Sequence, residues 1–106
     1  MTPPGTRPGE REDVALEERP EVRTPRMYRV LLHNDDYTTM EFVVAVLVQY
    51  FDHDVTGATR IMLQVHHAGV GVAGRFTRDE AETRAERATA EARRQGFPLL
   101  LTVEPE

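Results

Sequence analysis

The 106-residue sequence contains no cysteine, which excludes disulfide bonds and thiolate metal ligands. It also lacks lysine, so all 13 basic residues are arginine, and 18 acidic residues leave a net charge of -5. Such a chain lacks the concentrated basic face that nucleic-acid phosphates require. No stretch approaches the roughly 18 apolar residues of a membrane span, and no secretory signal is visible. We therefore expect one small cytoplasmic domain without nucleic-acid or membrane partners.

Residues 1–25 differ in composition from the rest of the chain. They hold five of the seven prolines and many charged residues, and Val14-Ala15-Leu16 is their one short apolar run. A segment of this kind buries too little apolar surface to offset its ordering entropy. We expect a disordered N-terminal extension over 1–25, which could be an inert tail, and a core domain over 26–106.

The pattern after residue 26 predicts short strands and helices in mixed and not strictly alternating order. Thr38 with Glu41 and Thr77 with Glu80 have the spacing of capping boxes, Asp54 is a suitable N-cap, and Gly69 is a suitable helix end. Gly71 and Gly74 indicate a bulge or a close backbone approach within a strand. The expected elements are strands at 27–32, 70–76 and 99–103 and helices at 39–51, 55–67 and 78–95. The order βααβαβ predicts an α+β fold, with a three-stranded antiparallel sheet and three helices on one face.

Two polar clusters flank apolar helix positions. Asn34-Asp35-Asp36 follows the first strand, and His66-His67 ends the second helix. The short connection over residues 52–54 favours antiparallel helices, which brings His66 near Asn34. Helical spacing places Met40 with Val43, and Met62 with Val65 and His66, on shared faces. We expect a pocket with hydrogen-bond acceptors at its rim and apolar side chains inside.

A free protein N-terminus matches such a pocket. An ammonium group has three N–H donors and no acceptor. Asn34 offers a carbonyl oxygen, Asp35 and Asp36 offer carboxylates, and His66 offers a ring nitrogen when neutral. An α-amino group is mostly protonated at pH 7, whereas an imidazole ordinarily is not. Ordinary structural roles account for the same residues equally well at this level: a capped turn, a helix-end histidine and core methionines.

The run MYRVLLHNDDYTTMEFV at residues 27–43 closely resembles the ClpS family of protease adaptors. The resemblance continues through ATRIMLQVHHAG, GRFTRDEAET and FPLLLTVE, and it covers roughly residues 26 to 104. It implies a monomeric adaptor without enzymatic activity or cofactor. Such adaptors bind N-degrons, which are substrates that begin with Leu, Phe, Tyr or Trp. They deliver them to the N-terminal domain of a ClpA-type or ClpC-type AAA+ unfoldase, which works with the ClpP peptidase.

The resemblance also implies roles for particular residues. The groups that match amine-binding and rim positions are Asn34, Asp35, Asp36, Thr38 and His66. Those that match the apolar lining are Met40, Val43, Met62, Val65 and Leu99, with Met40 narrowing the pocket against β-branched first residues. Glu82, Thr83 and Arg84 match the unfoldase-docking surface, and the segment before Arg26 matches an extension needed for substrate delivery.

Four positions depart from the family pattern. Thr39 stands where proline is frequent, and Arg84 replaces a usual lysine, which changes hydrogen-bond geometry but not charge. His67 replaces a commonly aromatic residue, and His33 an aliphatic one.

Two other functions remain open at this level. A metal hydrolase would use side chains from His33, Asp35, Asp36, His66 and His67, although no H-E-x-x-H spacing is present. A general interaction module of the same fold, related in shape to the C-terminal domain of a ribosomal stalk protein, would have no amine pocket.

Overall fold

The computed structural model describes residues 24–106, and the elements follow one another in the predicted order βααβαβ. They are β1 (Met27–His33), α2 (Met40–Phe51), α3 (Val55–Ala68), β2 (Val70–Thr77), α4 (Arg78–Arg94) and β3 (Leu100–Pro105). No predicted bound differs from the observed one by more than two residues. The predicted disordered extension lies outside the described residues except for Thr24 and Pro25.

The three strands form one antiparallel sheet in the order β2-β1-β3. Val30 pairs with Gly74 while the next residue, Leu31, pairs with Val72, so Ala73 is the extra residue of a β-bulge. The bulge predicted from the glycines of this strand is therefore confirmed. A Cβ on Gly71 would lie 2.7 Å from Cγ2 of Val65, so a glycine here lets α3 approach β2 closely.

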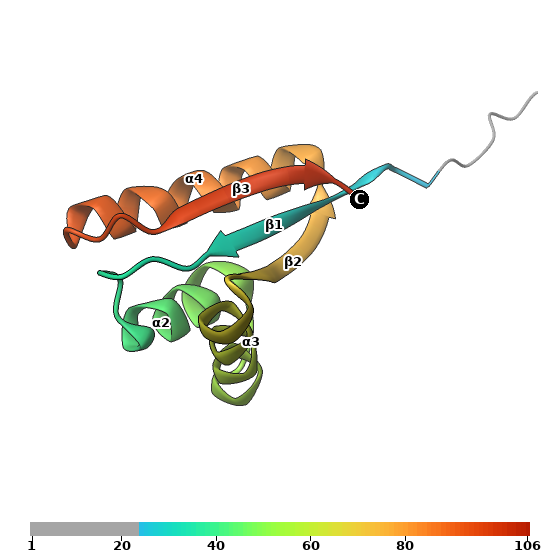
Figure 1. Ribbon diagram of the computed structural model, residues 1–106. Helices are drawn as coiled ribbons and strands as arrows, with labels where there is room; N and C mark the ends of the chain where they lie inside the picture. The colour runs from blue at the N-terminus through green and yellow to red at the C-terminus, as the bar shows by residue number, and fades with distance from the viewer. Residues whose placement is uncertain (1–23) are drawn as a thin grey trace, which may run out of the picture.

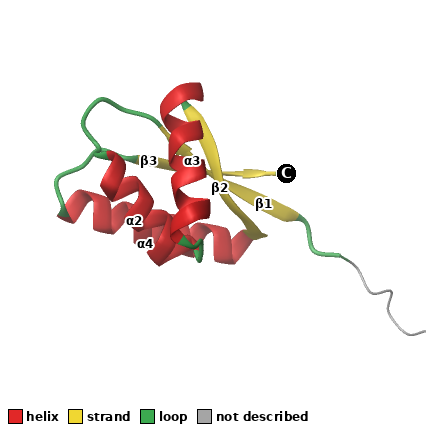
Figure 2. Cartoon of the chain, turned by 90° about the horizontal axis from the view of Figure 1, so that it is seen from below, coloured by secondary structure: helices red, strands yellow, loops and turns green. Residues whose placement is uncertain are grey.

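The helices cover one face of the sheet (Figure 1). In the views of Figures 1 and 2, α4 runs along the strands and α3 runs across them. Because side chains alternate along a strand, Val30 and Leu32 of β1 point toward the helices and are fully buried. Leu31 and His33 lie on the opposite face and are half-buried.

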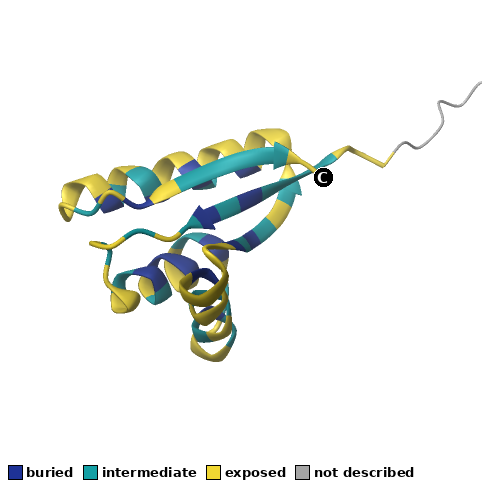
Figure 3. Cartoon of the chain, in the orientation of Figure 1, coloured by how far each residue is buried: buried dark blue, intermediate teal, exposed yellow. Residues whose placement is uncertain are grey.

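The core is formed by apolar residues from the sheet and the helices, and buried residues are dark blue in Figure 3. The largest fully buried side chains are Leu32, Leu47, Leu99, Val30, Val46 and Val65. Helix α4 buries only a row of alanines, Ala81, Ala85, Ala88 and Ala92. Helix α3 buries only Ala58 and Val65. No helix within residues 24–106 is long and apolar enough to cross a membrane.

The helix caps follow the sequence with two corrections. The N-cap of α2 is Thr39, whose hydroxyl accepts from the Phe42 N–H at 3.1 Å, and not the predicted Thr38. The Thr38 hydroxyl is instead oriented toward Asp35, to which it donates. Thr77 is the N-cap of α4 by position, but its side chain makes no capping hydrogen bond. The caps predicted at Asp54 and Gly69 are confirmed.

Candidate functional site

The loop after β1 is held at both ends by hydrogen bonds. The Asn34 N–H donates to the Gly69 carbonyl at 2.9 Å, which ties the start of this loop to the end of α3. Gly69 adopts a left-handed conformation with φ of 90°, which is favourable for glycine. The two polar clusters predicted from the sequence therefore meet because a strand end and a helix end share a backbone hydrogen bond.

The Asp35 carboxylate organises the next turn. Its Oδ1 accepts from the backbone N–H groups of Tyr37 at 2.8 Å and Thr38 at 2.7 Å, and its Oδ2 accepts from the Thr38 hydroxyl at 2.8 Å. This is the local pattern by which aspartate stabilises turns. Three of its hydrogen-bonding positions are thus occupied within the protein. The sequence-based interpretation of Asp35 as a rim acceptor did not anticipate this role.

These contacts also set the pKa of Asp35. Partial burial raises the pKa, but the hydrogen bonds from Thr38 and Tyr37 and the positive charge of Arg93 outweigh burial. The net result is a pKa below the ordinary aspartate value, because each of these contacts stabilises the carboxylate form. At neutral pH the turn therefore has an ionised carboxylate at its centre.

A cavity of about 290 Å³ lies between this turn and the helices α2 and α3. Its lining residues are Asn34, Asp35, Asp36, Thr38, Met40, Val43, Met62, Val65 and His66. The polar groups come from the turn and the last turn of α3, and the apolar groups come from facing sides of α2 and α3. The predicted polar residues and four of the five predicted apolar residues are thus brought together.

Two of the predicted lining residues differ in their surroundings. Leu99 is not among the residues that line the cavity, and its side chain is 1% exposed within the core. Met40, which the helical pattern alone would place in the core, is 43% exposed at the cavity. The side chain of Met40 is therefore accessible to a ligand, whereas that of Leu99 is not.

The two histidines at the end of α3 are unequal. His66 lines the cavity, whereas His67 does not. Their rings pack edge to face with centroids 5.1 Å apart, and both residues are exposed. His33, a further candidate ligand, forms a hydrogen bond through Nε2 with the Thr102 hydroxyl at 2.8 Å on the sheet. Within residues 24–106, no group of three or more histidine or carboxylate side chains is arranged to hold a metal ion.

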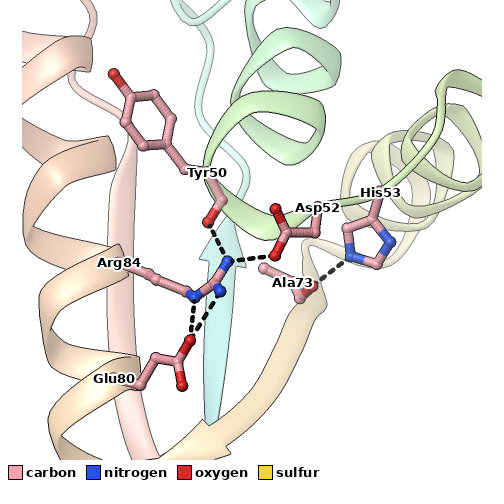
Figure 4. Close-up of polar contacts among 6 residues, drawn as sticks. All are labelled: Tyr50, Asp52, His53, Ala73, Glu80 and Arg84. Carbon is pink, nitrogen blue, oxygen red and sulfur yellow. Dashed lines mark hydrogen bonds and ion pairs between the residues drawn. The ribbon is translucent and has the colours of Figure 1, made fainter.

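The residues expected to dock an unfoldase lie on α4, and Arg84 is largely engaged inside the protein (Figure 4). Its guanidinium donates to the Tyr50 carbonyl at 3.0 Å, to Asp52 at 2.9 Å and to Glu80 at 2.8 Å. It also stacks 4.5 Å from the ring centre of Phe76. Arg84 thereby ties α4 to the end of α2, and Glu82 and Thr83 remain exposed.

A second arginine that holds the fold together, Arg93, was not predicted from the sequence. Arg93 donates from Nη1 to the carbonyls of Phe97 at 2.8 Å and Leu99 at 3.0 Å, which fixes the segment before β3. The Phe97 ring packs on Phe42 of α2 with centroids 4.8 Å apart. An arginine in the last turn of a helix is a known signal for bonding to nearby carbonyls, but the sequence does not say which carbonyls.

Comparison with known proteins agrees with this arrangement. Residues 23–102 match the family model described as ClpS, ATP-dependent Clp protease adaptor protein. The chain is 55% identical over 94 residues to the ClpS adapter of Desulfatibacillum aliphaticivorans, covering 89% of this chain and 90% of the relative. It is 52% identical over 104 residues to that of Deinococcus radiodurans, covering 98% and 91%.

A solved structure is similar in fold as well as in sequence. It is Agrobacterium tumefaciens ClpS2 bound to L-phenylalaninamide, with a TM-score of 0.75 and 43% identity. The alignment covers 78% of this chain and all of that one. The chain therefore belongs to the ClpS family of ATP-dependent Clp protease adaptors.

Proposed function

We propose that this protein binds the free α-amino group and the bulky apolar first side chain of a substrate, and delivers that substrate to a Clp unfoldase. The observation that carries the proposal is the cavity, which combines acceptors at its rim with an apolar interior. The relative solved with L-phenylalaninamide supports it, because that ligand has one free amine and one aromatic side chain.

The rim suits an ammonium ion. Asn34 and Asp36 are exposed at the cavity and offer oxygen acceptors, and His66 offers a ring nitrogen in its neutral form. Asp35 and Thr38 belong to the same rim, where Asp35 mainly holds the turn and leaves part of Oδ2 for the ligand. Each hydrogen bond from a charged donor is worth about 1.5–3 kcal/mol, so losing the amine's charge removes much of the binding.

The interior suits one large side chain. Val43 and Val65 are buried at its base, and the more exposed Met40 and Met62 form adaptable walls. The volume of about 290 Å³ is at the lower limit of the ~300–1,000 Å³ typical of small-molecule sites. We therefore expect Leu, Phe, Tyr or Trp as the first residue, with roughly 1.5–3 kcal/mol gained from burying it.

Delivery is the second half of the proposal. It rests on the family resemblance, with Glu82 and Thr83 exposed on α4 for contact with a ClpA-type or ClpC-type unfoldase. Arg84 contributes by positioning α4. The protein acts here as a cytoplasmic adaptor and not as an enzyme. A general interaction module without an amine site would leave the cavity without a purpose.

Two experiments test the two halves. Fluorescence anisotropy should show binding of peptides that begin with Phe or Leu, and N-acetylated copies should bind at least 100-fold more weakly. Equal affinity for both copies would contradict amine recognition. Removing residues 1–25 should leave this affinity unchanged but slow degradation by the unfoldase and ClpP. A full degradation rate after truncation would contradict the role of the extension in delivery.

A further inference from the structure

The exposed apolar side chains of this protein concentrate on α2 and α3. Met40 is 43% exposed, Val48 38%, Val55 64% and Leu63 43%, so four of the seven large apolar residues exposed in the described part of the chain lie here. Single exposed apolar residues need no explanation, but a contiguous patch of them often marks an interaction site. Figure 3 shows how much of α3 is exposed.

These side chains form a strip that begins at the cavity. On α2, Met40, Val44 and Val48 are spaced four residues apart and share one face. On α3, Met62, Thr59 and Val55 share a face in the same way, with Leu63 beside them. Met40 and Met62 both line the cavity, and the helices are joined at the other end by residues 52–54, so both rows lead away from the cavity. We call these seven residues the apolar strip.

The helices that carry the strip are almost uncharged. Helix α2 contains one charged residue, Glu41, and α3 contains one, Arg60, apart from the histidines at its end. Both charges lie at the border of the strip, because Glu41 is three residues from Val44 and Arg60 is three residues from Leu63. The exposed positions of α4, in contrast, are mostly arginine and glutamate. A partner bound to the strip would therefore be mainly apolar.

We propose that the apolar strip binds the residues that follow the captured first residue of a substrate, and so selects extended apolar N-terminal segments. This inference rests on the proposed function, because the strip is continuous with the amine pocket. From Met40 to Val48 the helix rises about 12 Å. An extended chain advances about 3.3 Å per residue, so three to four substrate residues match this length. The preferred substrates are cleaved or unfolded chains whose second to fourth residues are apolar.

Three ligands separate the strip from the pocket. L-Phenylalaninamide reports on the pocket alone, and the hexapeptides Phe-Leu-Val-Leu-Gly-Ser and Phe-Gly-Ser-Gly-Gly-Ser differ only in residues two to four. We expect isothermal titration calorimetry to show about tenfold tighter binding of the apolar peptide, equivalent to about 1.4 kcal/mol. Equal affinity of the two peptides for the wild-type protein would overturn the inference. Failure of L-phenylalaninamide to bind would instead contradict the proposed function.

Matched variants locate the effect on the protein. Val48→Ser combined with Val55→Ser should reduce the tenfold preference to less than twofold and leave L-phenylalaninamide affinity unchanged. Valine and serine have similar helix propensities, so the fold is retained. Val70→Ser on β2 is the control, because Val70 is also 38% exposed but lies outside the strip. A preference that survives in the double variant would overturn the inference. The inference would also be overturned if the wild-type protein were a dimer that the double substitution dissociates. The same holds if the double substitution changed only unfoldase binding.

Discussion

Replacing Asp35 with alanine removes three hydrogen bonds at once, from the Tyr37 N–H, the Thr38 N–H and the Thr38 hydroxyl. Losing a comparable capping aspartate costs about 0.5–2 kcal/mol, and Asp35 is only partly buried. We expect Asp35→Ala to lower the free energy of unfolding by about 1–2 kcal/mol. In a domain of this size that corresponds to a decrease in Tm of about 4–8 °C per kcal/mol.

The same change should weaken peptide binding at least tenfold, because the released turn no longer holds Asn34 and Asp36 at the cavity. Asp35→Asn separates the two ways in which Asp35 could act. The amide oxygen can still accept from both backbone N–H groups, and the amide nitrogen can donate to the Thr38 hydroxyl. If Asp35 acts by holding the turn, Asp35→Asn should keep the affinity within about threefold of the wild-type value.

Anisotropy titration of a Phe-initiated peptide and thermal unfolding followed by circular dichroism measure both effects. Asp36→Asn is the matched control, because Asp36 is exposed at the rim and its side chain has no hydrogen bond in the described part of the chain. It should lower affinity without changing Tm. The reasoning is refuted if Asp35→Asn loses as much affinity as Asp35→Ala while Tm stays at the wild-type value, since Asp35 would then act as a direct partner of the amine.

Three further outcomes follow from the structure. Arg84→Ala should lower the free energy of unfolding in urea by about 2 kcal/mol, because it leaves the Tyr50 carbonyl and Asp52 without their partner. Arg84→Lys should recover only part of this stability. Equal stability of all three proteins would contradict the role of Arg84 in tying α4 to α2. Asp35 has a lowered pKa in the folded protein. The stability that its carboxylate contributes is therefore complete above the ordinary value of 3.8 and is lost as pH falls through the native pKa. The stability difference between wild type and Asp35→Asn should thus shrink between pH 5 and pH 2.5, and a constant difference would argue against this assignment. Gly71→Ala should lower the free energy of unfolding by about 1–3 kcal/mol and weaken peptide binding, because the added methyl displaces Val65 at the cavity. An unchanged affinity in calorimetry would contradict this displacement.

The sequence predicted the secondary structure well because its local signals are strong. Asp54 and Gly69 cap the two ends of α3 as expected. The error at Thr38 shows where local rules end. Thr38 and Thr39 are equally good N-caps in isolation, and the choice between them depends on the competing hydrogen bond from Thr38 to Asp35.

Some features of the candidate site could likewise be predicted from the sequence, and others could not. The acceptors of the turn and the apolar helix positions were identified from residue type, spacing and family resemblance. The burial of Leu99 and the hydrogen bonds from Arg84 to Tyr50 and Asp52 could not be predicted in this way. The last two partners lie 34 and 32 positions before Arg84 in the chain. Residue type shows what a side chain is able to contact, and long-range packing selects among those contacts.

By itself, the sequence determined the order of helices and strands, the absence of thiol chemistry and the set of groups able to hold an ammonium ion, since these depend on residue type and near neighbours. Only the tertiary structure decided which of those groups share a cavity. The bulge at Ala73, the close approach at Gly71 and the hydrogen bond from Asn34 to Gly69 place the end of α3 against the turn after β1. The hydrogen bond from Asn34 to Gly69 joins residues 35 positions apart, and its geometry depends on how the whole core packs.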